Sequence, residues 1–301
     1  VVLDRIGLTG ATGMLGRHIQ TAFENSAVDV VSVSRAGDNL TAHWNLEKWL
    51  NSEELNNMFS GIQAVVHAGA FVQTSGEIDQ ARMFDVNVRA CFNLGQWALK
   101  KNIPMVYVSS AIVYANPYEL LQDELSELGW NGLGGFYSFS KLMAEDVLMR
   151  LRQQGLKVAI IRPTSIYGNG IDKEKMVSHF LTSAIADRVI KLIEPIEDKV
   201  DLIHAADVAS ATLAVLRHES WDIFNVSSGH PVSIIELARE CLGVAGSGSI
   251  SISGKCQKDY HSKVTCSLDT TRAQERLGWQ PVIDIRKGLG MLLHKQYSVS
   301  N

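Results

Sequence analysis

The sequence places a tyrosine and a lysine four residues apart, at Tyr137 and Lys141, within a stretch of helical patterning. Side chains at this spacing lie on one face of a helix, so the ammonium can stand beside the phenol. A neighbouring cation favours the ionised phenol, and we expect it to lower the pKa of Tyr137 towards neutrality. Ser109 and Ser110 end an apolar run, where a hydroxyl can hydrogen-bond a substrate oxygen. We therefore expect Ser110, Tyr137 and Lys141 to be catalytic.

A glycine-rich turn follows the first apolar run, with glycines at positions 10, 13 and 16. Such glycines permit a tight turn, a close approach of the backbone to a pyrophosphate, and close packing of the following helix. The pyrophosphate then meets N–H groups at the positive end of that helix. We expect a dinucleotide cofactor to contact Gly10, Thr12, Gly13, Met14, Leu15 and Gly16.

The end of the second apolar run selects the cofactor. NAD sites usually place an acid there for the ribose 2′-hydroxyl, whereas NADP sites place an arginine nearby for the 2′-phosphate. Here Ser34 takes the place of the acid and Arg35 follows it, while Asp29 begins the run and Asp38 comes after it. We expect NADP(H), with NAD(H) bound without an acid anchor as the alternative. Asn45 is a candidate for contact with the adenine.

Strand-like and helical segments alternate over the first half of the chain, which predicts a parallel sheet covered on both faces. The expected strands are residues 6–9, 28–34, 64–67, 105–109 and 158–162, and the expected helices are 14–24, 52–59, 79–101 and 137–154. The later part is less regular. We expect helices at 175–187, 205–217, 233–242, 270–277 and 285–294, strands at 189–193 and 222–226, and a loose Gly/Ser segment at 243–253.

These segments predict an α/β protein: a Rossmann-type doubly wound parallel sheet with a smaller mixed C-terminal substrate domain. We expect residues 1–165 to form the dinucleotide-binding domain, with 204–226 rejoining it. Residues 166–203 and 227–301 are then the substrate-binding part.

Composition excludes several classes of protein. The chain has 301 residues, of which 46% are hydrophobic and 20% charged, so it can bury a sizeable core. A net charge of −4 with no basic stripe argues against nucleic-acid binding. No apolar run approaches the roughly 20 residues of a membrane span, and no signal-peptide pattern is visible. Because the four cysteines form no CxxC pair, we expect no metal site and a reducing, cytoplasmic setting.

Further motifs carry a family resemblance that covers nearly the whole chain. They are residues 66–70 (VHAGA), 108–114 (VSSAIVY), 162–168 (RPTSIYG), 202–208 (LIHAADV), 224–226 (FNV) and 277–281 (LGWQP). Together with the glycine turn and the Tyr–Lys pair, they resemble the extended short-chain dehydrogenase/reductase family, the NAD(P)-dependent epimerase/dehydratase group.

The resemblance implies roles for individual residues. Tyr137 is then the acid/base, Ser110 polarises the substrate carbonyl or hydroxyl, and Lys141 holds the nicotinamide ribose. The segment with His67, Ala68 and Gly69 lies beside the cofactor, and Pro163 and Ser165 line the nicotinamide. Asn87 matches a helix asparagine used structurally near the site, although a solvated face explains it equally well.

Departures from the family pattern narrow the chemistry. The 4,6-dehydratases place an Asp–Glu pair after the catalytic hydroxyl, and here Ala111 and Ile112 cannot transfer protons. No cysteine stands in this turn to serve as a second proton-transfer group. His179 falls near a histidine acid of the 3,5-epimerases. The candidate substrate residues are Ser110, Ala111, Tyr137, Thr164 and His179.

A second departure concerns the substrate. Nucleotide-sugar members carry an asparagine and an arginine on the diphosphate, and the corresponding positions here read Lys175–Met176 and Val200. Either Lys175 and Lys199 substitute as phosphate charges, or the substrate has no diphosphate. The loop 117–135 is either a lid over the substrate or a variable surface loop.

We expect an NAD(P)-dependent oxidoreductase or epimerase that transfers hydride at a carbinol or carbonyl carbon of a nucleotide-activated sugar. One alternative is an NADPH-dependent reductase of a small non-nucleotide aldehyde or ketone. A second is a non-catalytic NADP-binding sensor, which would be expected to lose the tyrosine or the lysine. By the resemblance, the partner is a second copy of the chain, in a homodimer packed through helices 79–101 and 137–154.

Overall fold

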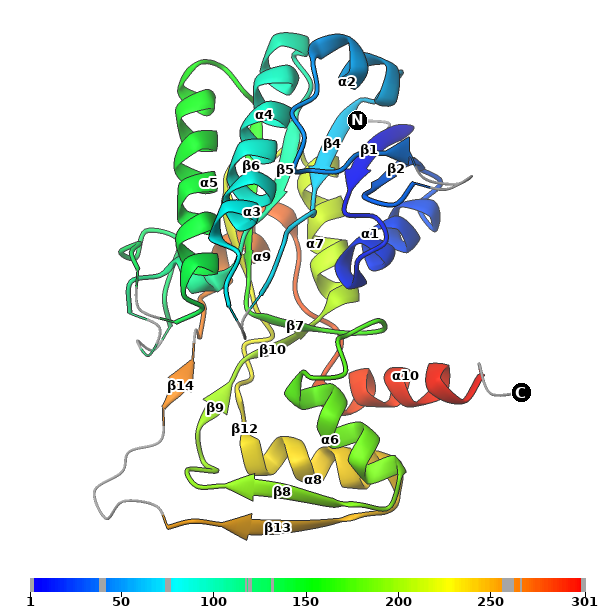
Figure 1. The fold of residues 1–301 in the computed structure, drawn as a ribbon, viewed down its shortest axis with the longest axis vertical. Helices are drawn as coiled ribbons and strands as arrows, with labels where there is room; N and C mark the ends of the chain where they lie inside the picture. Colours follow the sequence, from blue (N-terminus) through cyan, green and yellow to red (C-terminus); the bar gives the residue numbers. More distant parts are fainter. Residues whose placement is uncertain are drawn as a thin grey trace.

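The computed structural model describes residues 3–37, 42–73, 77–116, 118, 121–130, 133–255, 263–265 and 267–298. The larger part contains β1 Arg5–Thr9, α1 Met14–Glu24, β2 Asp29–Ser34, β3 Ala42–His43, α2 Ser52–Met58, β4 Ala64–His67, α3 Gln80–Phe84, α4 Ala90–Lys101, β5 Met105–Val108, α5 Phe136–Gln153, β6 Val158–Pro163, α7 Ala205–Arg217, β11 Ile223–Val226 and α9 Thr271–Leu277. Figure 1 shows these elements together in the upper part of the molecule.

A seven-stranded sheet with the strand order β11-β6-β5-β4-β1-β2-β3 forms the centre of this part, and every pairing in it is parallel. Alternate strand residues serve opposite faces. Val66 packs in the core that holds α1 and α7, whereas Val65 packs in the core that holds α2, α4 and α5. The expected Rossmann-type doubly wound sheet is confirmed, and β11 extends it beside β6, as predicted for the segment after residue 204.

The expected helix 79–101 is confirmed as helical over residues 80–101, but it is not α-helical throughout. A π-helical turn, Asp85–Arg89, separates α3 from α4. The turn holds one residue more than an α-helical turn does, and it buries Asn87. A short 3₁₀ helix, Ala111–Val113, follows β5, and the short strand β3 was not predicted.

The smaller part contains α6 Met176–Ile185, α8 Ile234–Ala245, α10 Ile285–Ser298 and paired short strands, and it lies below the sheet in Figure 1. The strand pairs are β7 Ser165–Tyr167 with β10 Leu202–His204, β8 Val189–Ile193 with β13 Ser249–Ser253, and β9 Lys199–Val200 with both β12 Val232–Ser233 and β14 Val264–Thr265. Its own core includes Phe180, Ile190, Leu237 and Leu289. None of the described helices is long and apolar enough to cross a membrane.

Two segments of the tail differ from expectation. The segment expected to be loose contains β13, which pairs with β8 in parallel and directs Ile250 towards the core of the smaller part. In addition, α9 and Trp279 pack against the core of the larger part, although residues 227–301 were expected in the smaller one. The indole of Trp279 donates a hydrogen bond to the Ser210 hydroxyl on α7, which ties the tail to the sheet domain.

Candidate active site

The glycine turn between β1 and α1 leaves no room for side chains. Gly10 has a φ of +75°, and a Cβ atom added there would lie 2.6 Å from the backbone nitrogen of Gly69. A Cβ atom at Gly16 would lie 2.0 Å from the carbonyl oxygen of Gly10. The turn therefore packs against the end of β4 on one side and the first turn of α1 on the other.

The start of α1 fits a pyrophosphate. Gly13 is the N-cap residue, and no side chain caps the N–H groups of the first turn, which contains Met14 and Leu15. N–H groups and the helix dipole at such an end attract negatively charged oxygen atoms. The residues present thus fit the phosphates of a dinucleotide.

A cavity of about 280 Å³ opens beside this turn. Its lining includes eight of the expected cofactor residues, namely Gly10, Thr12, Gly13, Ser34, Arg35, Asn45, Ala68 and Gly69. It also includes residues that the sequence did not single out, namely Thr9, Val33, Trp44, Leu46, Glu47, Ala70, Phe71, Arg82 and Val86. Met14, Leu15, Gly16, His67, Pro163 and Ser165 are not part of this lining. The cavity lies at the ends of β1, β2 and β4, where the adenosine half of a dinucleotide would bind.

Two arginines border this cavity in different electrostatic states. Arg35 is exposed, and it forms no ion pair with another described residue. Arg82 lies over the ring of Phe71, 4.5 Å from its centroid, and its Nε is 2.8 Å from a carboxylate oxygen of Glu47. The charge of Arg82 is thus largely balanced by Glu47, whereas Arg35 has no acidic partner among the described residues. Asp38 lies outside the described residues.

His67 is buried behind the cavity wall rather than in it. Its Nδ1 shares a hydrogen bond of 2.6 Å with the Thr9 hydroxyl, and its ring stacks on Tyr107. Burial, with a smaller contribution from the positive charge of Lys141, lowers the pKa of His67 to about 3. The imidazole is therefore neutral at physiological pH and links the ends of β1 and β4.

Lys141 projects from α5 to the end of β5. Its side chain is 3% exposed, and its Nζ donates a hydrogen bond of 2.8 Å to the carbonyl oxygen of Val108. The Nζ atom lies 5.9 Å from the centroid of the Tyr137 ring. Burial lowers the pKa of Lys141 to about 8, partly offset by the charges of Cys91 and Glu145.

The expected lowering of the Tyr137 pKa is wrong for this structure. Burial raises the pKa of Tyr137 to about 12, because removing water penalises the phenolate. Lys141 directs its Nζ to Val108 and does not offset this penalty. The phenol is therefore protonated at neutral pH.

Ser110 lies at the turn that follows β5. Its Oγ accepts a hydrogen bond of 3.3 Å from the backbone nitrogen of Ile112, and so caps the 3₁₀ helix Ala111–Val113. This helix contacts α5, while Lys141 reaches back to Val108. Ser110, Tyr137 and Lys141 are thus gathered at the carboxyl end of β5. Ala111 is buried there and has no group that could transfer a proton.

Asn87 holds the cofactor wall to α5. Its side-chain oxygen accepts a hydrogen bond of 2.8 Å from the Phe71 nitrogen, and its amide nitrogen donates to the Phe71 carbonyl and to the Ser140 hydroxyl. Ser140 directly precedes Lys141. The asparagine therefore has a buried structural role, and the alternative of a solvated face is wrong.

A buried ion pair anchors α5 to the sheet. Glu145 follows Lys141 by one helical turn. Its carboxylate accepts hydrogen bonds from Nε and Nη2 of Arg162 on β6, the shortest being 2.7 Å. The remaining Nη1 of Arg162 donates to the Tyr114 hydroxyl, which itself donates to Asn225. The arginine of the RPTSIYG segment thus has a positioning role that the sequence did not reveal.

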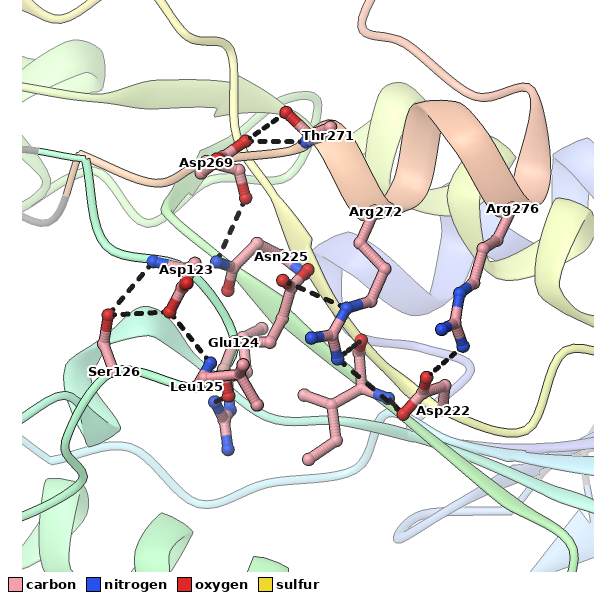
Figure 2. Close-up of polar contacts among 12 residues, drawn as sticks. Asp123, Glu124, Leu125, Ser126, Asp222, Asn225, Asp269, Thr271, Arg272 and Arg276 are labelled. Carbon is pink, nitrogen blue, oxygen red and sulfur yellow. Dashed lines mark hydrogen bonds and ion pairs between the residues drawn. The ribbon is translucent and has the colours of Figure 1, made fainter.

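The polar network continues beneath the loop that follows β5. Figure 2 shows Glu124 between Asn225 and Arg272. The Glu124 carboxylate accepts a hydrogen bond of 2.8 Å from the Asn225 nitrogen and lies 3.3 Å from Nε of Arg272 on α9. The loop expected as a lid is thus fixed to β11 and α9 at residue 124, which restricts any lid to other residues of the loop.

Two candidate substrate residues lie elsewhere. The Thr164 hydroxyl is buried and donates to the carboxylate of Asp201, 3.1 Å away. His179 is exposed on α6 and lines a cavity whose lining includes neither Ser110 nor Tyr137. Among the described residues, no group of three or more His, Cys, Asp or Glu side chains could hold a metal ion.

Comparisons with known proteins agree with this geometry. The chain matches the NAD dependent epimerase/dehydratase family over residues 6–227. A putative UDP-glucose 4-epimerase of Methanocaldococcus jannaschii is 26% identical, over 94% of this chain and 95% of the relative. A dTDP-4-dehydro-6-deoxyglucose reductase of Escherichia coli is 25% identical, over 95% of each chain.

The fold also has solved counterparts. The structure of MoeE5 in complex with UDP-glucose and NAD has a TM-score of 0.84 at 21% identity, and the match covers 99% of this chain and 100% of that one. The family match spans more than half of the chain and includes both the glycine turn and the cluster at the end of β5. The chain therefore belongs to the NAD-dependent epimerase/dehydratase family of extended short-chain dehydrogenases/reductases and is an NAD(P)-dependent enzyme.

Proposed function

We propose that this enzyme exchanges hydride and a proton at a carbinol or carbonyl carbon of a nucleotide-activated sugar. The observation that carries the proposal is the meeting of Lys141 with the end of β5, within 5.9 Å of the Tyr137 ring centroid and beside Ser110. When bound, the nicotinamide cofactor supplies the hydride acceptor or donor. The chain supplies the rest: it binds and orients the substrate and the cofactor, and it moves the proton.

Tyr137 is the proton-transfer group of this proposal. With a pKa raised to about 12, its phenol keeps its proton at neutral pH and can donate it to a substrate oxygen that gains negative charge. The Ser110 hydroxyl can hydrogen-bond the same oxygen and polarise the carbonyl. In its protonated state the phenol can serve as the acid of a reductive step, whereas an oxidative step needs it to accept a proton. If a ketone intermediate rotates in the site and is reduced on its other face, the net reaction is epimerisation.

Lys141 orients the cofactor in this scheme. Its pKa of about 8 keeps the ammonium mostly protonated at pH 7, so its protons can serve hydroxyl groups of the nicotinamide ribose. We assign Pro163 and Ser165 to the same end of the cofactor, because Pro163 ends β6, a neighbour of β5 in the sheet, and Ser165 begins β7, the strand that follows.

We assign NADP(H) as the preferred cofactor. Arg35 borders the adenosine cavity without an acidic partner among the described residues, and Ser34 stands where NAD sites usually carry an acid. The Ser34 hydroxyl accepts a hydrogen bond from the Gly37 nitrogen, which shapes the loop on which Arg35 stands. A 2′-phosphate bound there would meet the Arg35 guanidinium.

The named relatives act on nucleotide sugars, which supports the same substrate class here. A second candidate, reduction of a small non-nucleotide aldehyde or ketone, is favoured by Val200. This apolar residue occupies the position of the phosphate-binding arginine on β9, and of its two chain neighbours only Lys199 offers a positive charge. Comparing turnover of a keto-sugar nucleotide with that of its free sugar separates the two candidates.

Three substitutions test the catalytic assignment. Tyr137→Phe keeps the ring but removes the proton, so turnover should fall roughly 10²–10⁴-fold while NADPH affinity holds. Ser110→Ala should also lower turnover with little effect on NADPH binding. Lys141→Met should lower both, because its ammonium serves the ribose and the end of β5 together. The exposed Tyr118→Phe is the matched control.

Single-turnover hydride transfer and NADPH binding are the measurements. A Tyr137→Phe enzyme with near-native turnover would defeat the proton-transfer role. Binding of NADPH without turnover by the wild-type protein, across keto-sugar nucleotides and simple carbonyls, would instead refute the proposed reaction.

We also propose a homodimer in a reducing, cytoplasmic setting. On the two helices expected at the dimer contact, Met83, Leu148 and Leu151 are buried within their own subunit, whereas Phe84 is 41% exposed on α3. Phe139 on α5 is similarly exposed, so these two helices still offer apolar surface to a second copy. The buried thiols of Cys91 and Cys241 are unpaired, which is consistent with a reducing compartment.

A further inference from the structure

A cavity of about 800 Å³ lies between the sheet domain and the smaller part, apart from the adenosine cavity. One wall belongs to α1, and the other consists of the loop after β7, α6, the residues that follow α6, and Leu292 of α10. The lining shares no residue with the adenosine cavity and includes none of Ser110, Tyr137 and Lys141. It is therefore a separate site, of a volume typical for small-molecule ligands.

The charge of this cavity is one-sided. Three cationic side chains line it, Arg17 from α1, Lys173 from the loop and Arg188 beyond α6, and none of its described lining residues is an acid. None of the three forms an ion pair with a described residue. Three acids adjoin these cations in the sequence, and none of them lines the cavity. Asp172 accepts a hydrogen bond from the Glu174 nitrogen, Asp187 accepts one from the Gly248 nitrogen, and Glu174 is exposed.

The chain as a whole has a net charge of −4, so this cationic lining does not follow from the overall composition. Unpaired cations on two facing walls repel one another and are stabilised by a shared anion. The lining also offers the hydroxyls of Thr182 and Ser183 and the imidazole of His179 as hydrogen-bond groups for phosphate oxygens. A small concave site of this kind suits a compact anion better than a long polymer.

We propose that this cavity binds a phosphorylated small molecule that carries more than one negative charge. The ligand bridges Arg17 of the sheet domain and Arg188 of the smaller part, so its binding also fixes the two walls relative to one another. The proposal does not depend on the substrate assignment above, because it concerns a different set of residues.

Inorganic pyrophosphate is the probe, titrated calorimetrically into the enzyme with NADPH at saturation, so that the glycine turn is occupied. We expect binding that weakens as salt is added. The double variant Arg17→Gln/Arg188→Gln should weaken it roughly 3- to 30-fold, since each solvent-open charge contact contributes modestly. The double variant Lys157→Gln/Arg217→Gln removes the same charge from exposed positions outside the lining and should leave affinity unchanged.

Three results would overturn the proposal. They are no pyrophosphate binding by the wild-type enzyme, binding that disappears when NADPH is saturating, and equal weakening in both double variants. The first two results would mean that this cavity does not bind the anion. The third would mean that the weaker binding follows from the lower net charge of the protein and not from the loss of Arg17 and Arg188. Thermal unfolding of each variant checks that its fold is intact, and hydride transfer is a separate readout that does not bear on this site.

Discussion

Replacing Glu145 by glutamine should destabilise the protein strongly although it changes one atom. The carboxylate meets Arg162 through three N···O contacts of 3.2, 3.2 and 2.7 Å, and the two side chains are 4% and 1% exposed. An amide cannot neutralise the guanidinium, and its NH₂ group would face other donors. Breaking a buried pair by removing one partner costs about 3–5 kcal/mol. That is a large share of the 5–15 kcal/mol by which domains are usually stable.

The same helix provides a matched control. Asp146 is the next residue, and it pairs with Arg150 at 3.0 Å, but these side chains are 65% and 71% exposed. Asp146→Asn should therefore cost at most about 1 kcal/mol. Denaturant unfolding at pH 7, followed by both circular dichroism and tryptophan fluorescence, measures the two variants and tests whether one transition describes them.

The Glu145 variant should also affect the site, because the Glu145 charge helps to raise the pKa of Lys141. Without it, that pKa should fall below about 8, and the alkaline limit of NADPH binding should move to lower pH. A Glu145→Gln protein as stable as Asp146→Asn would refute the assignment of the pair as the anchor of α5. An unchanged pH profile in a folded variant would refute its electrostatic link to Lys141.

Further outcomes follow from the same structure. Arg35→Asp should weaken NADPH binding roughly 10- to 150-fold and NADH binding much less, measured by fluorescence titration, and equal losses would remove the NADP assignment. The pKa of His67 is about 3 in the folded protein and 6.5 in the unfolded chain, so the free energy of unfolding should fall as the pH drops below 6.5, by about 2 kcal/mol at pH 5. His67→Asn should not show this part of the pH-dependent loss. Gly16→Ala should abolish NADPH binding, whereas Gly290→Ala, with nothing within 4 Å of its added Cβ, should not. Phe84→Glu should convert a dimer into a monomer in sedimentation, and a wild-type monomer at all concentrations would contradict the dimer.

The sheet and the glycine turn could be predicted because their signals are local. Strand β4 and helix α1 begin and end where the sequence indicated, since buried parallel strands are apolar throughout and the glycines mark the turn. Strand β13 was missed because a Gly/Ser-rich stretch is typical of a loop. Only the pairing with β8, more than fifty residues away, supplies its hydrogen bonds, and Ile250 supplies its buried face.

The candidate site was predictable by residue type but not by protonation state or support. Tyr137 and Lys141 could be found from their spacing, but the high pKa of the phenol depends on burial by the whole fold. The spacing also gave no sign that Lys141 would bind the Val108 carbonyl. Partners such as Glu145 and Arg162 lie 17 residues apart, and neither position reveals the other without the packed sheet.

The π-helical turn at Asp85–Arg89 changes the rotation of α3 about the helix axis relative to α4, so the two halves of one long helix present their side chains in different directions. An α-helix advances by about 100° per residue, so removing one residue from this turn to restore a regular helix would rotate α3 by that angle relative to α4. Arg82 would then leave the Phe71 ring and Glu47, while Asn87 would lose its inward position. The extra residue thus lets the two segments pack in different orientations. The orientation of α4 follows from its packing in the subunit core, and that of α3 from its place in the wall of the adenosine cavity. As long as this extra residue is kept, a mutation on the surface of α3 or α4 can alter that surface without rotating the other segment.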